Sequence, residues 1–190
     1  MASKALYLAK KANKTELKWH TTLVASPIVF SSNRYIRTLS DIAQGTGGNS
    51  RVGLVLTPTS INLSLLMQLD DLGTMSHTVR VILFLWRTEK YSEISDGDYL
   101  QTSDVLSYKN EEKRFMSKTL YDRAYSLSPN GTRQMSVSIK RKLSGIMAYG
   151  ASDANSQNKN QLVLAIYTDT KSGDPDPLVT WNSRLYFTDK

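Results

Sequence analysis

The chain has 190 residues, 40% of them hydrophobic, which is enough for one sizeable core and makes a single domain the default. It contains no cysteine, which excludes disulfides, thiolate metal sites and a cysteine nucleophile. The formal net charge of +7 favours nucleic acid or an anionic membrane surface as a partner. No apolar run reaches the roughly 18 residues that a membrane helix needs, so we expect no membrane insertion.

The first residues are rich in lysine and show no sustained apolar period. We therefore predict a basic N-terminal arm over residues 1–13 and one folded domain over residues 14–190. A strand opens that domain, because Leu17, Trp19, Thr21 and Leu23 alternate with Lys18 and His20. The first candidates for contacts to phosphate are four lysines of this region: Lys4, Lys10, Lys11 and Lys14.

A glycine-rich segment at residues 41–55 separates a short predicted strand at 34–39 from a longer one. Gly45, Gly47 and Gly48 predict a tight connection, where backbones approach closely. A phosphate-binding loop would require a Lys-Ser or Lys-Thr pair after the last glycine and then a helix. Arg51-Val52-Gly53 and a strand pattern follow instead, so a structural connection is favoured over a nucleotide site.

Two apolar strands come next. Residues 61–69 alternate apolar and polar side chains, which predicts a strand with one buried face. A turn at 70–74 predicts a hairpin to residues 76–86, where both faces are apolar. Such a strand must be covered on both sides, by a second sheet or by neighbouring subunits.

The remaining chain adds strand patterns at 113–127, 135–140, 162–168 and 178–187. An acidic stretch at 88–110 reads as a long surface excursion. The total is about eight strands without a convincing amphipathic helix, which predicts an all-β antiparallel sandwich or barrel. Further candidates for phosphate contacts lie in the basic part of this region, with a solvated strand face as the equal alternative: Lys113, Arg114, Lys140, Arg141 and Lys142.

The residues needed for catalysis are scarce. The only two histidines, His20 and His77, lie in separate predicted strands, and no serine stands in a nucleophile elbow. Acidic pairs fall in turns, where solvated side chains are a better interpretation than a calcium site. We expect a protein that is not an enzyme, with no catalytic residue, no metal and no cofactor.

Several segments in order resemble one family. Gln44-Gly45, Arg51-Val52-Gly53, Arg114-Phe115 and Asp122-Arg123 stand where capsid proteins of small circular single-stranded-DNA viruses (circovirus-like) carry a glycine-rich QG segment, an Arg-x-Gly, an Arg-Phe and a downstream Asp-Arg. The similarity runs from about Leu17 to Asp189, and a looser one exists to coat proteins of plant satellite necrosis viruses. Members of this group usually begin with an arginine-rich arm, whereas the first arginine here is Arg34.

The resemblance implies an eight-stranded antiparallel single jelly-roll sandwich. It also implies a homo-oligomer of sixty copies (T=1) that encloses a single-stranded genome through non-specific phosphate contacts. The expected location is the virion, assembled in the infected cell with the nucleus as one candidate compartment, and the host cell-surface receptor is not specified. Gly45, Arg51 and Gly53 become structural or interface residues, and Arg51 is expected to pair with a carboxylate in its own subunit or across an interface.

Two rival functions use the same fold class. A non-viral carbohydrate-binding β-sandwich would present loop aromatics as sugar platforms, with Tyr91, Tyr99 and Tyr149 as candidates. A monomeric binder of single-stranded nucleic acid would stack bases on Tyr121 and Tyr125.

Overall fold

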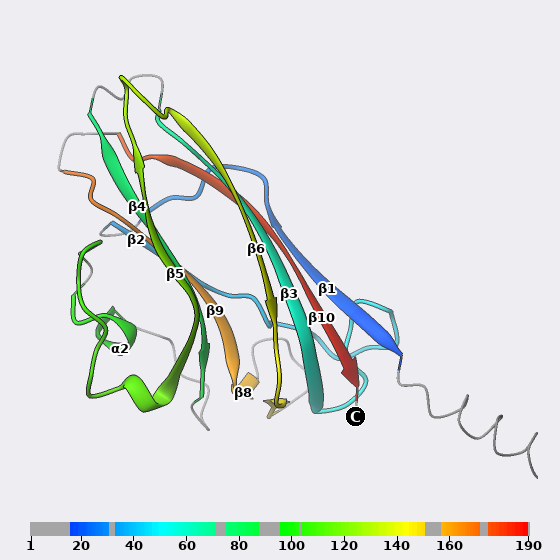
Figure 1. The fold of residues 1–190 in the computed structure, drawn as a ribbon. Coiled ribbons are helices and arrows are strands. Elements are labelled where there is room, and N and C mark those ends of the chain that lie inside the picture. Colours follow the sequence, from blue (N-terminus) through cyan, green and yellow to red (C-terminus); the bar gives the residue numbers. More distant parts are fainter. Residues whose placement is uncertain are drawn as a thin grey trace, which may run out of the picture.

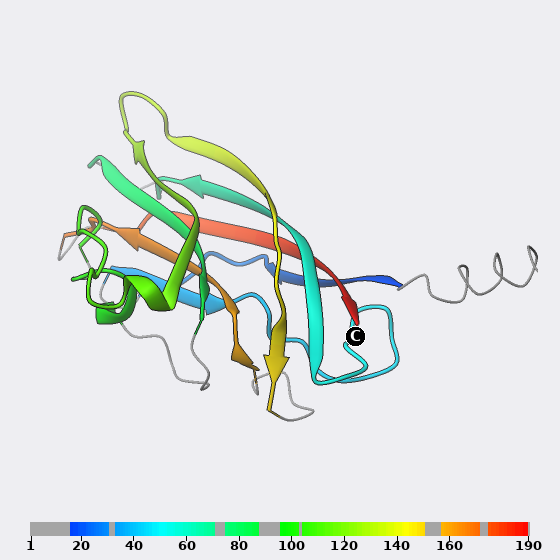
Figure 2. The ribbon, with the colours of Figure 1, turned by 60° about the horizontal axis from the view of Figure 1, so that its bottom comes forward.

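The computed structural model describes most of the chain. The described residues are 16–30, 33–70, 75–87, 96–102, 104–150, 157–171 and 175–189. They form two antiparallel sheets that pack face to face, as Figures 1 and 2 show. The strands are β1 (Leu17–Val24), β2 (Arg34–Thr38), β3 (Val55–Gln68), β4 (His77–Trp86), β5 (Ser117–Leu127), β6 (Gln134–Lys142), β7 (Met147–Tyr149), β8 (Gln157–Lys159), β9 (Gln161–Thr168) and β10 (Leu178–Asp189).

The order of the strands identifies the topology. One sheet begins with the order β1-β10-β3. The longer, C-terminal part of β3 then pairs with β6, and its N-terminal end pairs with β7, which in turn pairs with β8. The other sheet has the order β2-β9-β4-β5. The antiparallel pairs are β1 with β10, β2 with β9, β3 with β6 and β4 with β5, and successive pairs lie in alternate sheets, which is the arrangement of a jelly roll. The predicted jelly-roll sandwich is confirmed. Beside eight strands of five or more residues, the described part contains two strands of three residues, β7 and β8.

The main core lies between the two sheets. Period-2 alternation in β3 and β10 directs every second side chain inward, so that Leu63, Leu65, Trp181 and Leu185 are each at most 2% exposed. Strand β9 is buried along its whole length, because it lies between β2 and β4 and is covered on both faces. Burial on both faces explains its uninterrupted apolar sequence.

A second, smaller cluster covers the outer face of sheet β2-β9-β4-β5. Helix α2 (Asp96–Tyr99) and the described residues after it, 100–102 and 104–110, form a covering segment on this face (Figure 2). The ring of Tyr99 stacks on that of Phe84 at 4.2 Å between centroids, and Leu100 is fully buried. The doubly apolar strand β4 is therefore covered on its outer face by its own chain rather than by a neighbouring subunit.

Strand β1 turns its apolar residues outward, whereas its sequence pattern predicted that they face the core. Its apolar residues face solvent, with Leu17 54%, Trp19 47% and Leu23 67% exposed. Lys18 is only 5% exposed, because its ammonium pairs with Asp189 at 2.7 Å and donates to the carbonyl of Ser50 at 3.3 Å. An ion pair at the end of the sheet thus fixes the register of an edge strand whose apolar side is open.

Candidate nucleic-acid interface

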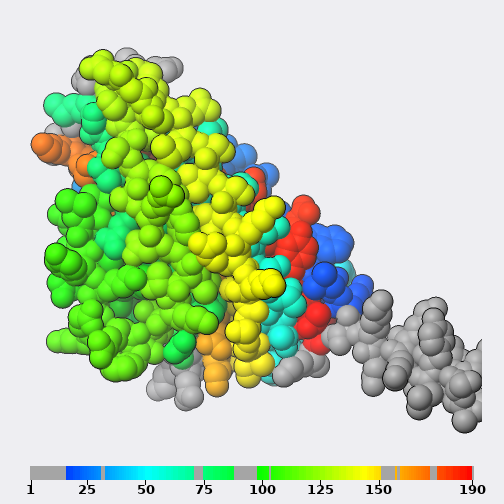
Figure 3. Space-filling view, in the orientation of Figure 1, coloured from blue at the N-terminus to red at the C-terminus, as the bar shows by residue number. Residues whose placement is uncertain are grey.

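No described residue outside the sheet covers the outer face of sheet β1-β10-β3-β6, and we call it the open face. It consists of alternate residues from Leu17 to Leu23, Thr180 to Thr188, Ser60 to Gln68 and Gln134 to Lys142. Figure 3 shows these strands as adjoining yellow, cyan, red and blue bands. No Asp or Glu belongs to this set, whereas Ser, Thr, Asn and Gln are frequent. The open face therefore carries positive charge without compensation by carboxylates on the same face.

Three cations and two aromatic rings lie on neighbouring rows of the open face. The pairing aligns Thr21, Arg184, Asn62 and Lys140 in one row across the four strands. The row two residues along contains Trp19, Tyr186, Ser60 and Lys142. Arg184, Lys140 and Lys142 are exposed, and none of them forms an ion pair with a described residue.

The structure divides the basic residues that the sequence nominated. Lys140 and Lys142 lie on the open face, but Arg141 points to the other side of β6, where its Nε donates to the carbonyl of Leu120 at 2.9 Å. Lys4, Lys10, Lys11 and Lys14 lie outside the described residues.

Lys113 and Arg114 lie away from the open face, at the short 3-10 helix η1 (Arg114–Met116) that precedes β5. The ammonium of Lys113 pairs with the carboxylate of Asp98, and Arg114 pairs with Glu111 at 3.2 Å. Both charges are thus compensated locally.

Trp19, Tyr186 and Arg184 were not among the sequence candidates. The alternation in β1 pointed to a strand in which the apolar side faces the core, whereas the structure turns it outward. The missing signal was Asp189, which pairs with Lys18 across the two ends of the chain and is 171 residues away in sequence. Such a long-range pairing has no local sequence signature.

Arg51 is completely buried in the connection between β2 and β3. Its Nε donates to the carbonyl of Ile42 at 2.9 Å and its Nη1 to that of Gly53 at 2.6 Å. Its guanidinium lies 4.0 Å from the ring centroid of Tyr149 in β7. The amide of Gly45 donates to the carbonyl of Arg51 at 2.8 Å, and a Cβ at Gly45 would lie 2.9 Å from Ser50 Oγ, so a larger residue there would require the Ser50 side chain to move. These contacts tie the connection between β2 and β3 to β7, and the structural or interface role expected of Gly45, Arg51 and Gly53 stays a prediction.

A buried polar network continues from Tyr149. Its hydroxyl donates to the carbonyl of Ser40 at 2.7 Å, and the Ser40 hydroxyl bonds with the side chain of Gln157 and accepts from the amide of Leu162 at 2.9 Å. Burial raises the pKa of Tyr149 far above its usual value. The network joins β7, β8 and β9 to the connection that holds Arg51.

Asp41 lies next to this network with a partly buried carboxyl. Its Oδ1 is buried and has no hydrogen-bond partner among the described residues. Burial raises the pKa of Asp41 to about 6, although Arg37 acts in the opposite direction. At a given pH, the carboxyl of Asp41 is therefore protonated in a larger fraction of folded chains than of unfolded chains.

Two of the aromatic residues of the rival functions are too deeply buried to serve as platforms. Tyr99 and Tyr149 are each 3% exposed, and Tyr91 lies outside the described residues. Tyr121 and Tyr125 are half-buried against the core, and their hydroxyls hydrogen-bond to each other. In the described part of the chain, no three His, Cys, Asp or Glu side chains come together as a metal site, and no helix has the length and hydropathy to span a membrane.

Comparison with known proteins gives a likeness in structure only. No protein-family model matches the chain, and no curated protein sequence matches it. The empty head of turnip yellow mosaic virus is similar over 93% of this chain and 82% of its own, with 7% identity and a TM-score of 0.41. Tomato aspermy virus is similar over 98% and 94%, with 11% identity and a TM-score of 0.40. The coat protein of tobacco streak virus is similar over 90% of this chain and 85% of its own, with 5% identity and a TM-score of 0.37.

Proposed function

We propose that the chain is a viral coat protein whose copies assemble into a closed icosahedral shell around a single-stranded nucleic-acid genome. The observation that carries the proposal is the asymmetry between the two sheet faces of the jelly roll. One outer face is sealed by the covering segment, while the open face carries Arg184, Lys140 and Lys142 without carboxylates. A wall that separates a genome from solvent needs two such different sides.

The asymmetry between the two outer faces indicates which sheet lines the interior of the proposed shell. Phosphates attract the basic open face, so this sheet lines the interior, and the covering segment faces outward. The basic N-terminal residues precede β1, which is the edge strand of the same sheet. Lys4, Lys10, Lys11 and Lys14 belong to this basic segment, and in this proposal they add further phosphate contacts.

Exposed apolar side chains supply the contacts between copies. Val29, Leu106, Tyr108 and Phe115 are each more than 70% exposed, so contacts between copies would remove their apolar surface from water. Burial of such side chains stabilises symmetric homo-oligomers, and sixty copies is the number of a T=1 shell. The resemblance of the sequence to circovirus-like capsid proteins supports a location in the virion, with the infected cell as the proposed site of assembly.

The rival function is a β-sandwich binding module that stays monomeric, and the open face would then bind single-stranded nucleic acid without a shell. Negative-stain microscopy of the purified chain, with and without a long single-stranded DNA, separates the two. The coat-protein proposal predicts hollow or filled particles of uniform diameter. A chain that stays dispersed in every condition, while it binds DNA, supports the rival.

A further inference from the structure

The open face holds the one tryptophan of the chain that solvent can reach. Trp19 is 47% exposed, whereas Trp86 and Trp181 are 3% and 2% exposed. Tyr186 is its cross-strand partner in β10 and projects from the same face. Directly opposed residues on one face have Cβ atoms about 5 Å apart. Two rings with accessible surface therefore lie side by side where phosphate-binding residues also gather.

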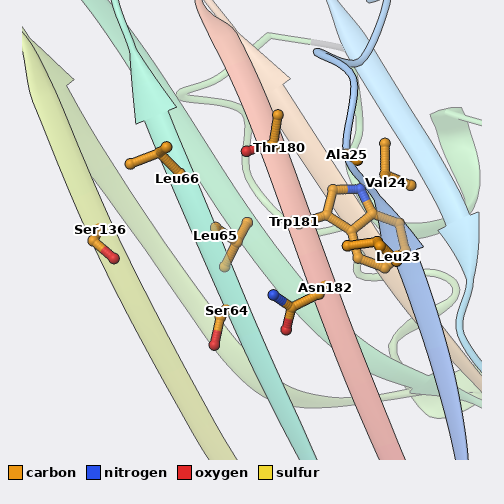
Figure 4. Close-up of a pocket in the computed structure, with 10 residues that line it drawn as sticks. All are labelled: Leu23, Val24, Ala25, Ser64, Leu65, Leu66, Ser136, Thr180, Trp181 and Asn182. Atoms are coloured by element: carbon orange, nitrogen blue, oxygen red, sulfur yellow. The ribbon is translucent and has the colours of Figure 1, made fainter.

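A groove continues from these rings along β10. Two hollows of about 370 and 290 Å3 share Leu23 and Asn182 among their lining residues, so they form one depression between β1 and β3. It runs from Tyr186 to Thr180, a length of about 20 Å at the usual rise of a strand. Figure 4 shows the smaller of the two hollows, and the residues that line it come mainly from β1, β10, β3 and β6.

The cations are placed to accompany a strand in this groove. Arg184 lies in the groove beside Tyr186, with its Nε 3.4 Å from the hydroxyl of Thr21. Lys140 lies two strands away on the same row, about 10 Å across the sheet at the usual strand spacing. Aromatic rings next to a row of cations are the combination by which proteins bind single strands, since bases stack while phosphates are neutralised.

We propose that unpaired bases stack on Trp19 and Tyr186 while their phosphates contact Arg184, Lys140 and Lys142, so that the open face selects single-stranded over double-stranded nucleic acid. The inference rests on the proposed function and specifies how the enclosed strand is held. In a duplex both faces of each base are covered by its neighbours, so the rings find no free base to stack on.

The test uses intrinsic fluorescence of the full chain, because Trp19 is the accessible reporter. A twenty-nucleotide oligo(dT), a duplex of equal length and inorganic polyphosphate are titrated at fixed salt. We expect oligo(dT) to quench the emission and to bind more tightly than polyphosphate, which offers charge without bases. Trp19→Phe should retain the affinity for oligo(dT), and Trp19→Ala should weaken it about five- to a hundredfold. Leu17→Ala, on the same side of β1, is the matched control and should leave it unchanged.

Equal affinity for oligo(dT) and polyphosphate, or equal behaviour of Trp19→Ala and Leu17→Ala, overturns the inference. It is also overturned if Trp19 is shielded from iodide in shells free of nucleic acid, because a second copy then covers the ring. Sedimentation of the same samples shows whether particles form, so it distinguishes a failure of this inference from a failure of the coat-protein function. Particles without base-dependent quenching leave the coat-protein function intact and remove this inference. Quenching without particles at any salt concentration retains the stacking site and removes the coat-protein function.

Discussion

The guanidinium of Arg51 lies over the ring of Tyr149, with its central carbon 4.0 Å from the ring centroid, and both residues are buried. Replacing Arg51 by Ala leaves the carbonyls of Ile42 and Gly53 without these bonds. We expect a loss of about 2–4 kcal/mol in the free energy of unfolding, since each buried unsatisfied acceptor costs about 1–3 kcal/mol. Arg51→Lys should recover only part of this lost free energy of unfolding, because an ammonium lacks the planar, forked arrangement of donors of a guanidinium. Urea denaturation measures both.

Arg184→Ala is the matched control for Arg51, since Arg184 is an exposed arginine on a strand. Its removal should change the free energy of unfolding by less than about 0.5 kcal/mol. If Arg51→Ala unfolds at the same urea concentration as this control, Arg51 has no mechanical role in the subunit.

The ion pair between Lys18 and Asp189 should hold the inverted edge strand in register. Its side chains are 6% and 17% exposed, and the other carboxylate oxygen accepts from the amide of Val52 at 3.2 Å. Asp189→Asn should destabilise the chain by about 2–4 kcal/mol, because the ammonium of Lys18 stays buried without a counter-charge. The double variant Lys18→Met with Asp189→Leu should be closer to the parent. A single variant that is as stable as the parent contradicts this account.

Asp41 should make the stability depend on pH. Its pKa is raised from 3.8 to about 6, so the folded chain binds a proton that the unfolded chain has released. The contribution is complete below about pH 4 and is lost as the pH rises through 6, about 1–2 kcal/mol after allowance for partial exposure of the carboxyl. Asp41→Asn should remove this fall between pH 4 and 7. Urea unfolding across that interval checks it, and equal slopes for both proteins would refute it.

Exposed apolar residues near the covering segment should be needed for assembly but not for folding. Tyr108 is 81% and Phe115 is 74% exposed. Replacing both by Ser should leave the circular dichroism spectrum and the urea midpoint unchanged and should reduce the yield of particles by at least about tenfold, the equivalent of 1.4 kcal/mol. Lys118→Ser, an exposed change on β5, is the control and should assemble normally. Normal assembly of the double variant would exclude these side chains from the contacts between copies.

Lys140 and Lys142 should contribute to nucleic-acid binding through counterion release. For single strands the slope of log K against log salt is about −0.7 per phosphate contact, so the change of both lysines to Ala should reduce its magnitude by about 1.4. Filter binding at several salt concentrations gives the slope. Lys118 and Lys171 are exposed away from the open face, and their joint change to Ala should leave the slope as it is. A slope that is reduced equally by both pairs would place the charge contacts elsewhere.

The sequence predicted the strands and the fold class because alternation within β3, β6 and β10 is a local property. Arg51 stood out through its position after the glycines, but its bonds to the carbonyls of Ile42 and Gly53 and its contact with Tyr149 could not be predicted. The outward turn of Trp19 depends on Lys18 meeting Asp189 from the other end of the chain. Sheet order alone brings Arg184 beside Lys140, so the open face has no counterpart in the linear pattern.

The most direct test of the central claim is sedimentation velocity of the purified full chain from low to high salt. The account predicts a sharp boundary at low salt, with a mass of about 1.3 MDa for sixty copies of the 21.3 kDa chain, that gives way to small species as salt increases. A single monomeric boundary at every salt concentration, with or without single-stranded DNA, would contradict it.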